Sequence, residues 1–477
     1  MKNKANKFLE IIKQIENSDM DVSLKSMTIA GVQLYILYIL QLTNRKMLSQ
    51  FVIEPVLKCD KSLSLSTDVL ANSIINLDDI STDVDETKIV EYVLQGYSVI
   101  VIDNEEKYIV ANTLKFEKRT TQSPEVEQTM LGARDSFTED IGSNVSLIRY
   151  RIKDPSLTIY RTIVGERTKT NVVVIYASDI ANSEYVNKII HKIDSIKIDG
   201  LLESGMVQKL LLNNTFDLFP QTGLVEKSDT ACNCILEGKI CVLVEGSPFA
   251  LVAPKGFFEF FVSSDDSYSY IYLGIIAKIL RFVCAFIYSG LSAFYISVVA
   301  FNFDILPPQY ALILAVSRAT VPFNAFTEIL LMEITAEILR ESSLRLPKQI
   351  GPAMGIVGTI VIGQAAVAAG LFSPLVVIIT SLSTMSSFII PDYSIINPFR
   401  LLKFMLIVLT GILGLFGFIM GMNIIVINLV SQSSFGMPYF APIAPFNFRD
   451  MKNYILNDLS LAKKRPNFLK TRDNTRQ

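Results

Sequence analysis

The stretch RLPKQIGPAMGIVGTIVIGQAAVAAGLF, from Arg345 to Phe372, decides how this chain is organised. No charged residue occurs between Gln349 and Phe372, so the segment is about long enough to cross a bilayer as one helix. Much of its apolar character comes from glycine and alanine, and small residues let helix backbones approach closely inside lipid. We therefore predict a packed membrane helix in preference to a plain hydrophobic anchor. The glycines expected to serve helix packing, here and in a later apolar stretch, are Gly351, Gly355, Gly358, Gly363, Gly417 and Gly421.

Charge is distributed unevenly along the 477 residues, which carry a formal net charge of −2. It is dense up to about Asp266 and sparse from Tyr268 to Ala444, so we predict a soluble part followed by a membrane part. Residues 1–21 have an amphipathic helical pattern and lack the apolar core of a signal peptide. The soluble part is therefore expected to stay in the cytoplasm. The sequence has no basic stripe, which argues against a nucleic-acid partner.

The soluble part contains two copies of one pattern. LQGYSVIVIDNEEKYIVA (Leu94–Ala111) aligns without a gap with LEGKICVLVEGSPFALVA (Leu236–Ala253), at a constant offset of 142 residues. Each copy is typical of a helix ended by glycine and followed by a β-hairpin. Earlier in the first copy, MTIAGVQLYILYILQL from Met27 is interpreted as one buried strand. We predict two related α/β subdomains at 22–118 and 146–265, with chance similarity of two generic units as the alternative.

Residues 119–145 connect the two predicted subdomains. They are polar but more varied than a plain linker, and they carry arginines and carboxylates suited to an ordered, interface-forming connector. A solvated hinge is the alternative, and the residues favour neither. The side chains expected to couple the subdomains, or neighbouring subunits, are Arg119, Glu125, Arg134, Glu139, Asp140 and Arg149.

The membrane part, 268–446, is predicted to be all-α and polytopic. Four stretches are apolar enough to span, near 274–300, 350–372, 374–390 and 401–430, and a broken or re-entrant hairpin is expected at 307–341. A basic C-terminal tail follows at 447–477. That tail and the loops RESSLRLPK and NPFRLLK all favour the cytoplasmic side, but four simple spans cannot place all three there.

Carboxylates stand out on the helical pattern after Pro322. Glu333 and Glu337 are one turn apart, and carboxylates in lipid must face protein, water or headgroups. One interpretation is a helix that lines a cation path in an oligomer. The other, slightly favoured by the residues alone, is an internally paired helix on the membrane surface. The candidate pore- or gate-lining residues are Asn324, Glu328, Glu333, Glu337 and Arg340.

The sequence carries no recognisable catalytic constellation. It has no P-loop, nucleophile elbow, zinc-protease motif or dinucleotide-binding glycine motif, and His191 is its only histidine. Its five cysteines lack metal-ligand spacing and are predicted to be free thiols in a reducing compartment. We expect no enzyme activity, no cofactor and no metal site.

Several long motifs carry a family resemblance. They include PEVEQTMLGARDSFTEDIGSNVSLIRYRI (Pro124–Ile152), FDLFPQT (Phe216–Thr222), SRATVPFNAFTEILLMEITAEILRESSLRLPKQIG (Ser317–Gly351) and SFGMPYFAPIAPF (Ser434–Phe446). With these motifs in this order, the chain resembles the A subunit of the GerA family of spore germinant receptors over nearly its whole length. It departs locally, with LVEKSD at Leu224–Asp229 where the family usually reads Thr-Glu-Arg-Pro-Asp.

The resemblance implies a multi-pass receptor subunit in the spore inner membrane, with its N-terminal domains in the cytoplasm. It implies partners as well: membrane lipid, a transporter-like B subunit that binds a small nutrient germinant, a lipoprotein C subunit, and further copies of this chain around a cation path. It also shifts our interpretation of the Glu328–Arg340 helix towards pore or gate lining. A secondary transporter is one alternative. A paralogous spore-membrane protein that acts downstream of the receptor is another.

Overall fold

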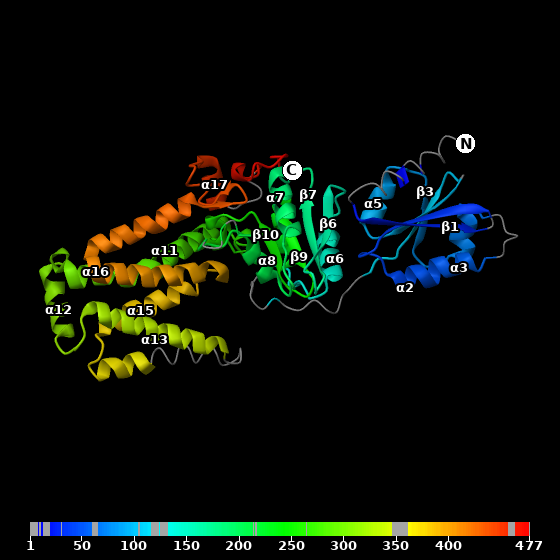
Figure 1. The fold of residues 1–477 in the computed structure, drawn as a ribbon. Helices are drawn as coiled ribbons and strands as arrows, with labels where there is room; N and C mark the ends of the chain where they lie inside the picture. Colours follow the sequence, from blue (N-terminus) through cyan, green and yellow to red (C-terminus); the bar gives the residue numbers. More distant parts are fainter. Residues whose placement is uncertain are drawn as a thin grey trace. The chain divides into compact units, whose positions relative to one another are not determined.

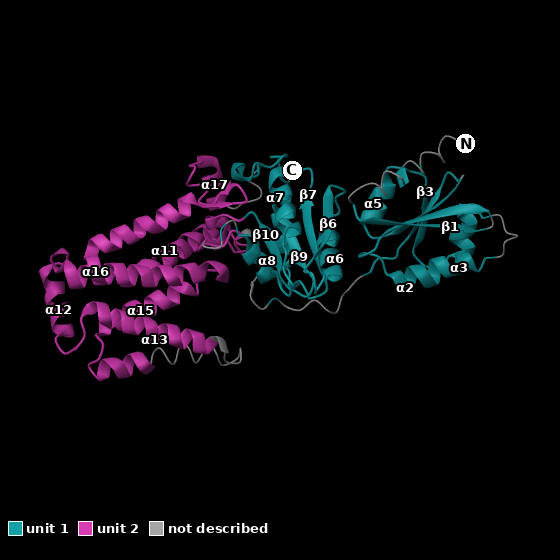
Figure 2. Cartoon of the chain, in the orientation of Figure 1, with its two compact units in different colours: residues 1–215, 222–254, 463–477 teal, residues 216–221, 255–462 magenta. Residues whose placement is uncertain are grey.

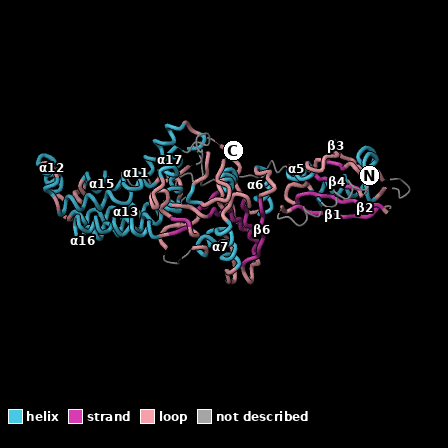
Figure 3. Tube along the Cα trace, turned by 90° about the horizontal axis from the view of Figure 1, so that it is seen from above, coloured by secondary structure: helices cyan, strands magenta, loops and turns pink. Residues whose placement is uncertain are grey.

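The structure is a computed structural model, and it forms two compact units (Figure 2). Unit 1 comprises residues 1–215, 222–254 and 463–477, and unit 2 comprises residues 216–221 and 255–462. Unit 1 mixes strands with helices, whereas unit 2 is almost entirely helical (Figure 3). The predicted division into an α/β part and a helical part is confirmed. The structure describes residues 8, 11–12, 20–29, 31–59, 65–103, 105–115, 124, 132–212, 214, 217–263, 265–345, 361–456 and 463–476.

The first subdomain of unit 1 is a five-stranded antiparallel sheet in the order β1-β2-β4-β5-β3. The expectation of one buried strand from Met27 was wrong. The chain turns at Gly31, whose φ of 79° is a conformation that glycine adopts readily, and the two flanking segments pair as a hairpin. The elements are β1 (Val22–Ile29), β2 (Val32–Ile39), α2 (Arg45–Met47), η1 (Leu48–Ile53), α3 (Glu54–Leu57), α4 (Thr67–Val69), η2 (Leu70–Ile74), β3 (Ile80–Asp83), α5 (Lys88–Leu94), β4 (Ser98–Ile102) and β5 (Tyr108–Ala111).

The second subdomain repeats this order, as β6-β7-β9-β10-β8. The two central hairpins, β4–β5 and β9–β10, are separated by the 142 residues of the sequence repeat, and all four strands are buried. Identical strand order is what a duplicated unit requires. The elements are α6 (Ile141–Arg151), β6 (Leu157–Val164), β7 (Thr170–Ala177), α7 (Ser183–Asp194), α8 (Ser204–Leu210), β8 (Gly223–Val225), α9 (Ser228–Leu236), β9 (Ile240–Val244) and β10 (Ala250–Ala253).

The C-terminal segment 463–476, which contains η6 (Asn467–Leu469), folds onto the second subdomain of unit 1. Arg465 donates from Nε to the carbonyl of Leu236 at 2.9 Å, and Arg476 forms an ion pair with Glu237 at 2.9 Å. We call residues 463–476 the C-terminal clasp. The sequence analysis treated 447–477 as one basic tail, whereas the structure divides it: α17 (Phe448–Leu456) belongs to unit 2 and the clasp to unit 1.

Unit 2 is a helical bundle, and two of its described segments are long and apolar enough to cross a membrane, Ile271–Phe301 and Tyr393–Ser431. Residues 361–368 are also helical, whereas Gly351, Gly355 and Gly358 of the predicted packing set lie outside the described residues. The elements are η3 (Phe257–Phe261), α10 (Asp265–Tyr268), α11 (Ile271–Ile296), η4 (Ser297–Phe301), η5 (Phe303–Ile305), α12 (Pro308–Arg318), α13 (Ala325–Arg345), α15 (Pro374–Ser387), α16 (Tyr393–Ser431), β11 (Ser433–Ser434), β12 (Met437–Pro438) and α17.

Helix α16 is broken at Gly414, where φ is 64° and ψ is −140°. A Cβ atom at Gly417 would collide with the carbonyl oxygen of Leu409, and one at Gly421 would lie 2.5 Å from Leu406 Cδ2. Along a straight helix, residues eight positions apart are separated by about 12 Å. The two arms of α16, 393–413 and 415–431, therefore fold back on each other as a helical hairpin (Figure 1). The single span predicted at 401–430 is corrected to this hairpin.

Helix α13 makes two contacts, at different heights along its axis, with each of three neighbouring helices, and each pair of contacts fixes the direction of that neighbour relative to α13. Helix α13 runs antiparallel to α11 and to the first arm of α16, and parallel to α15, so residues 361–368 return the chain to the start of α15. At the turn, a Cβ atom at Gly363 would lie 2.9 Å from Val377 Cγ1. The contacts that set these directions are Ser292–Glu333 and Tyr288–Arg340, Glu333–Lys403 and Glu337–Arg400, and Glu328–Ser373 and Arg340–Ser387.

Candidate functional site

Glu333 of α13 lies at the centre of a buried charge network in unit 2. Its Oε2 atom is 2.6 Å from Nζ of Lys403, and both side chains are at most 1% exposed. Ser292 of α11 donates to the other carboxylate oxygen at 2.5 Å. Burial removes both charges from water, so the ion pair is stable only while each partner compensates the other.

Tyr288 of α11 lies between two cations of this network. The Lys403 Nζ atom is 4.7 Å from the ring centroid of Tyr288, and Arg340 Cζ is 5.5 Å from it. Arg340 also donates to the Tyr288 hydroxyl at 3.1 Å and to Ser387 Oγ at 3.3 Å. The negative face of the ring and these hydroxyls supplement the carboxylates in a region with few water contacts.

A second ion pair, between Glu337 and Arg400, extends the network one turn further along α13. Both side chains keep about a fifth to a quarter of their exposed surface, so this end of the network reaches the surface of unit 2. The spacing of four residues between the glutamates and of three between the cations places each set on one helix face. We define the charge network as Tyr288, Ser292, Glu333, Glu337, Arg340, Arg400 and Lys403.

Three of the predicted pore- or gate-lining residues meet in this network, and two do not. Glu328 and Glu333 are both fully buried among helices of unit 2, so neither faces a surface of the unit. Asn324 is exposed, and its Oδ1 accepts from the Thr327 backbone at 2.8 Å as an N-cap of α13. The competing interpretation, a membrane-surface helix, expected its charges to pair within the helix, whereas Glu337 pairs with Arg400 of α16.

Arg400 and Lys403 were missed because NPFRLLK was interpreted as a basic loop. They lie instead in the first arm of α16, where they neutralise the two glutamates. The matching spacing of carboxylates and cations is a signal that could have paired them, since charges within membrane helices are expected to find one another.

Arg149, predicted as a coupling residue, is fully buried in unit 1. Its guanidinium donates to the carbonyl of Met20, in the first subdomain, at 2.7 Å and to the carbonyl of Asp154 at 3.3 Å. Burial lowers the pKa of Arg149 to about 10. Ser146, on the same helix, donates to the carbonyl of Gln41 at 2.7 Å, so α6 contacts both subdomains.

The other predicted coupling residues have varied surroundings. Asp140 caps α6, accepting from the Ser143 backbone at 2.7 Å, and this hydrogen bonding lowers the pKa of the Asp140 carboxyl. Arg134 and Glu139 are exposed. Arg119 and Glu125 lie outside the described residues.

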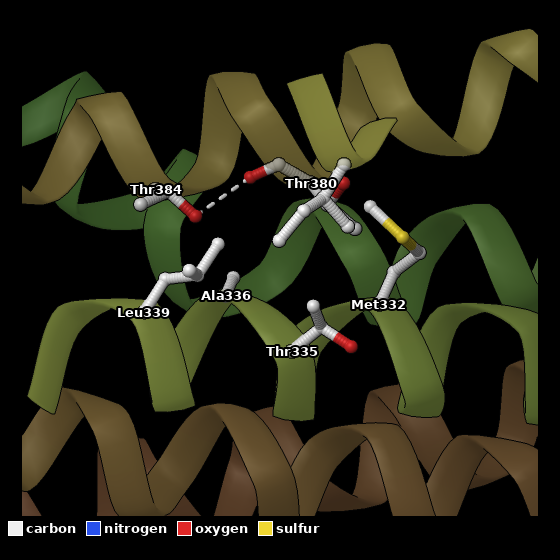
Figure 4. Close-up of a pocket in the computed structure, with 7 residues that line it drawn as sticks. Met332, Thr335, Ala336, Leu339, Thr380 and Thr384 are labelled. Atoms are coloured by element: carbon white, nitrogen blue, oxygen red, sulfur yellow. Dashed lines mark hydrogen bonds between the residues drawn. The ribbon is translucent and has the colours of Figure 1, made fainter. Parts of the chain in front are cut away.

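A small pocket lies on the other face of α13, against α15 and residues 361–368 (Figure 4). It has about 260 Å³ of empty space, part of it open to the surroundings. The hydroxyls of Thr335, Thr380 and Thr384 bond to carbonyls of their own helices, so the pocket offers mainly methyl and methylene groups. Among the described residues, no group of three or more His, Cys, Asp and Glu side chains is placed to hold a metal ion. The pocket is lined by Met332, Thr335, Ala336, Leu339, Ile362, Thr380 and Thr384.

Comparison with known proteins places the chain among spore proteins. The family model "Bacillus/Clostridium GerA spore germination protein" matches residues 10–468. Spore germination protein GerLA of Bacillus cereus is 33% identical, covering 98% of this chain and 96% of that protein. The membrane protein YfkQ of Bacillus subtilis (strain 168) is 31% identical, with coverages of 94% and 92%. The crystal structure of the N-terminal domain of the A subunit of the Bacillus megaterium spore germinant receptor GerK3 is 26% identical, covering 52% of this chain and 94% of that chain, with a TM-score of 0.41.

Proposed function

Because the chain belongs to the GerA family of spore germination proteins, we propose that it is the A subunit of a nutrient receptor in the spore inner membrane. The observation that carries this proposal is the family match over residues 10–468, which includes both α/β subdomains and the helical bundle. Relatives named spore germination proteins support a role in germination. Nutrient recognition is assigned to a transporter-like partner, and a lipoprotein subunit completes the receptor.

The direction of the helices supports a membrane topology with six passages. These are α11, α13, a returning passage to which the helical residues 361–368 belong, α15, and the two arms of α16. An even number returns the chain to its starting side. The C-terminal clasp supports an even count. The chain enters unit 2 from the second subdomain of unit 1, and the clasp, which follows unit 2, binds that same subdomain, so both ends of unit 2 must lie on one side of the membrane.

Six passages also remove the charge conflict of the sequence. The basic segments RESSLRLPK, at the end of α13, and NPFRLLK, near the start of α16, then share one side with unit 1 and the C-terminal clasp. The positive-inside rule makes that side the cytoplasm. Helix α15, with 14 residues, is short for a bilayer core, but it packs between α11 and α13, so neighbouring protein covers its polar ends.

The charge network is proposed to couple nutrient sensing to a cation path formed by several copies of the chain. A path-lining role suits Glu337, which keeps exposed surface, better than Glu333, which is enclosed by Lys403 and Ser292. In this proposal α13 and the first arm of α16 move together while the ion pairs hold, and the receptor opens when their register changes.

Cation flux into liposomes that contain the purified chain tests the channel role. Glu337→Gln is expected to change cation selectivity, and Glu333→Gln to change the open fraction. Asp304→Asn, which removes an exposed carboxylate of unit 2, is the matched control and should leave flux unchanged. Equal flux in all four proteins, with assembly intact, would remove the network from the conduction mechanism.

A second candidate is a paralogous membrane protein that acts downstream of the receptor, because YfkQ is nearly as similar as GerLA. Deleting the gene and measuring spore germination separates the two. Loss of the response to one class of nutrient supports a receptor subunit, whereas weaker responses to all nutrients support the downstream role.

A further inference from the structure

Four polar side chains from four elements meet where α12 joins α13. They are Tyr295 of α11, Arg318 at the end of α12, Glu328 in the first turn of α13, and Ser373 at the N-cap of α15. Glu328 and Ser373 are fully buried, and Tyr295 is nearly so. Glu328 Oε1 accepts from the backbone N–H of Ser373 at 2.5 Å, so a side chain of α13 caps α15.

One polar atom of each side chain has no hydrogen-bond partner in the described part of the chain. Glu328 Oε2, Ser373 Oγ, Tyr295 Oη and Arg318 Nε are buried and make no hydrogen bond within the described part of the chain. Arg318 and Glu328 approach to 3.6 Å, too far for a good hydrogen bond. Tyr295 interacts with the Ser373 side chain, and Arg318 and Glu328 are its charged neighbours. Buried polar atoms are rarely orphaned, so four at one junction need a shared partner.

The four atoms match the bonding capacity of a water molecule. Arg318 Nε and Tyr295 Oη can donate, while Glu328 Oε2 and Ser373 Oγ can accept. A bare cation would meet the charge of Arg318, and an anion would meet that of Glu328, so a neutral ligand fits best. We propose that this junction binds an ordered water, which accepts from Arg318 and Tyr295 and donates to Glu328 and Ser373.

Such a water joins four elements at the N-terminal end of α13. The charge network connects the later part of α13 to α11 and α16. The water adds hydrogen bonds to an ion pair between Arg318 and Glu328 that is long, at 3.6 Å. The proposal concerns packing within unit 2 and does not depend on the receptor function.

Thermal unfolding of the full chain in detergent tests the proposal. Tyr295→Phe removes one partner of the water and should lower Tm by about 2–4 °C. Tyr439→Phe is the matched control, because the buried Tyr439 hydroxyl is also unpartnered but its ring packs against Phe219 and Phe257. That control should leave Tm unchanged or raise it. A rise with Tyr295→Phe would mean a dry junction and overturn the proposal.

Two measurements on the native chain complete the test. X-ray-driven hydroxyl-radical labelling, which modifies side chains beside bound water, should modify Tyr295 and spare Tyr439. Equal protection of both tyrosines would contradict a bound water. Replacing Na⁺ and K⁺ by a bulky organic cation at constant ionic strength should leave Tm unchanged, whereas a fall in Tm would identify a metal cation as the ligand and overturn the assignment.

Discussion

Two completely buried cations, Arg149 in unit 1 and Lys403 in unit 2, are satisfied differently. Arg149 donates to two backbone carbonyls, and the Asp21 and Asp154 carboxylates are its charged neighbours. Lys403 in unit 2 has a carboxylate at 2.6 Å and an aromatic face nearby. The difference lies in the surroundings of these two residues and not in the units as wholes, because Lys227 of unit 1 is equally buried and lies 3.4 Å from Asp229, while the buried Lys278 of unit 2 donates to the Tyr454 carbonyl. A cation held by neutral carbonyls leaves no buried carboxylate behind when it is removed, whereas a cation paired with a carboxylate does. The consequences of losing a partner should differ accordingly.

The largest effect is expected when the pair in unit 2 is broken. Lys403→Met leaves Glu333 buried and uncompensated, which should destabilise unit 2 by about 3–5 kcal/mol. Unfolding of the full chain in detergent with increasing denaturant measures this. The double variant Lys403→Met with Glu333→Gln should recover most of the loss, because no buried charge remains. If the double variant is as unstable as Lys403→Met, the pair is not what holds the two helices together.

Breaking the arrangement in unit 1 should have a smaller effect. Arg149→Met removes two hydrogen bonds, one of them to Met20 in the contact between α6 and the first subdomain, at a cost of about 1–3 kcal/mol. Hydrogen exchange of the α6 amides measures the loss locally. Arg134→Met, at an exposed arginine, is the control and should stay within about 0.5 kcal/mol of the native chain. Unchanged exchange in Arg149→Met would mean that α6 does not couple the subdomains.

The cap of the same helix gives an effect that depends on pH. Asp140→Ala should weaken α6 by about 1 kcal/mol, and Asp140→Asn by less, since asparagine also caps. The native-state pKa of Asp140 is lowered by the hydrogen bond from Ser143, so the stabilisation is present above the ordinary value of 3.8 and lost as pH falls through the lowered pKa. Hydrogen exchange at several pH values should therefore show the Asp140→Ala deficit shrinking in acid. A constant deficit would assign the effect to helix propensity alone.

How far the fold could be predicted from the sequence depended on whether each feature leaves a local signal. The hairpins β4–β5 and β9–β10 were predictable because glycine turns and alternating patterns are local signals. The turn at Gly31 was hidden in a continuous apolar run. The reversal of α16 at Gly414 was hidden in the same way, because both arms are apolar and no polar turn residues separate them. The partners of Glu333 come from two other helices: the spacing of Arg400 and Lys403 could have suggested Lys403, whereas Ser292 leaves no comparable signal in the sequence.

The smallest effect is expected at the C-terminal clasp, where the charge pair between Arg476 and Glu237 lies near the surface. Both side chains keep about a fifth of their exposure, so Arg476→Ala should cost no more than about 1 kcal/mol. Arg465 is more buried. It donates to the Leu236 carbonyl of the subdomain and to the Asp473 and Thr475 carbonyls of the clasp, so Arg465→Ala removes one tie to the subdomain and loosens the clasp itself, and should release it more fully. Proteolysis of the native chain measures release as cleavage within 463–476. If neither variant increases cleavage there, the clasp is held by Leu469 and its apolar contacts, and the arginines are incidental.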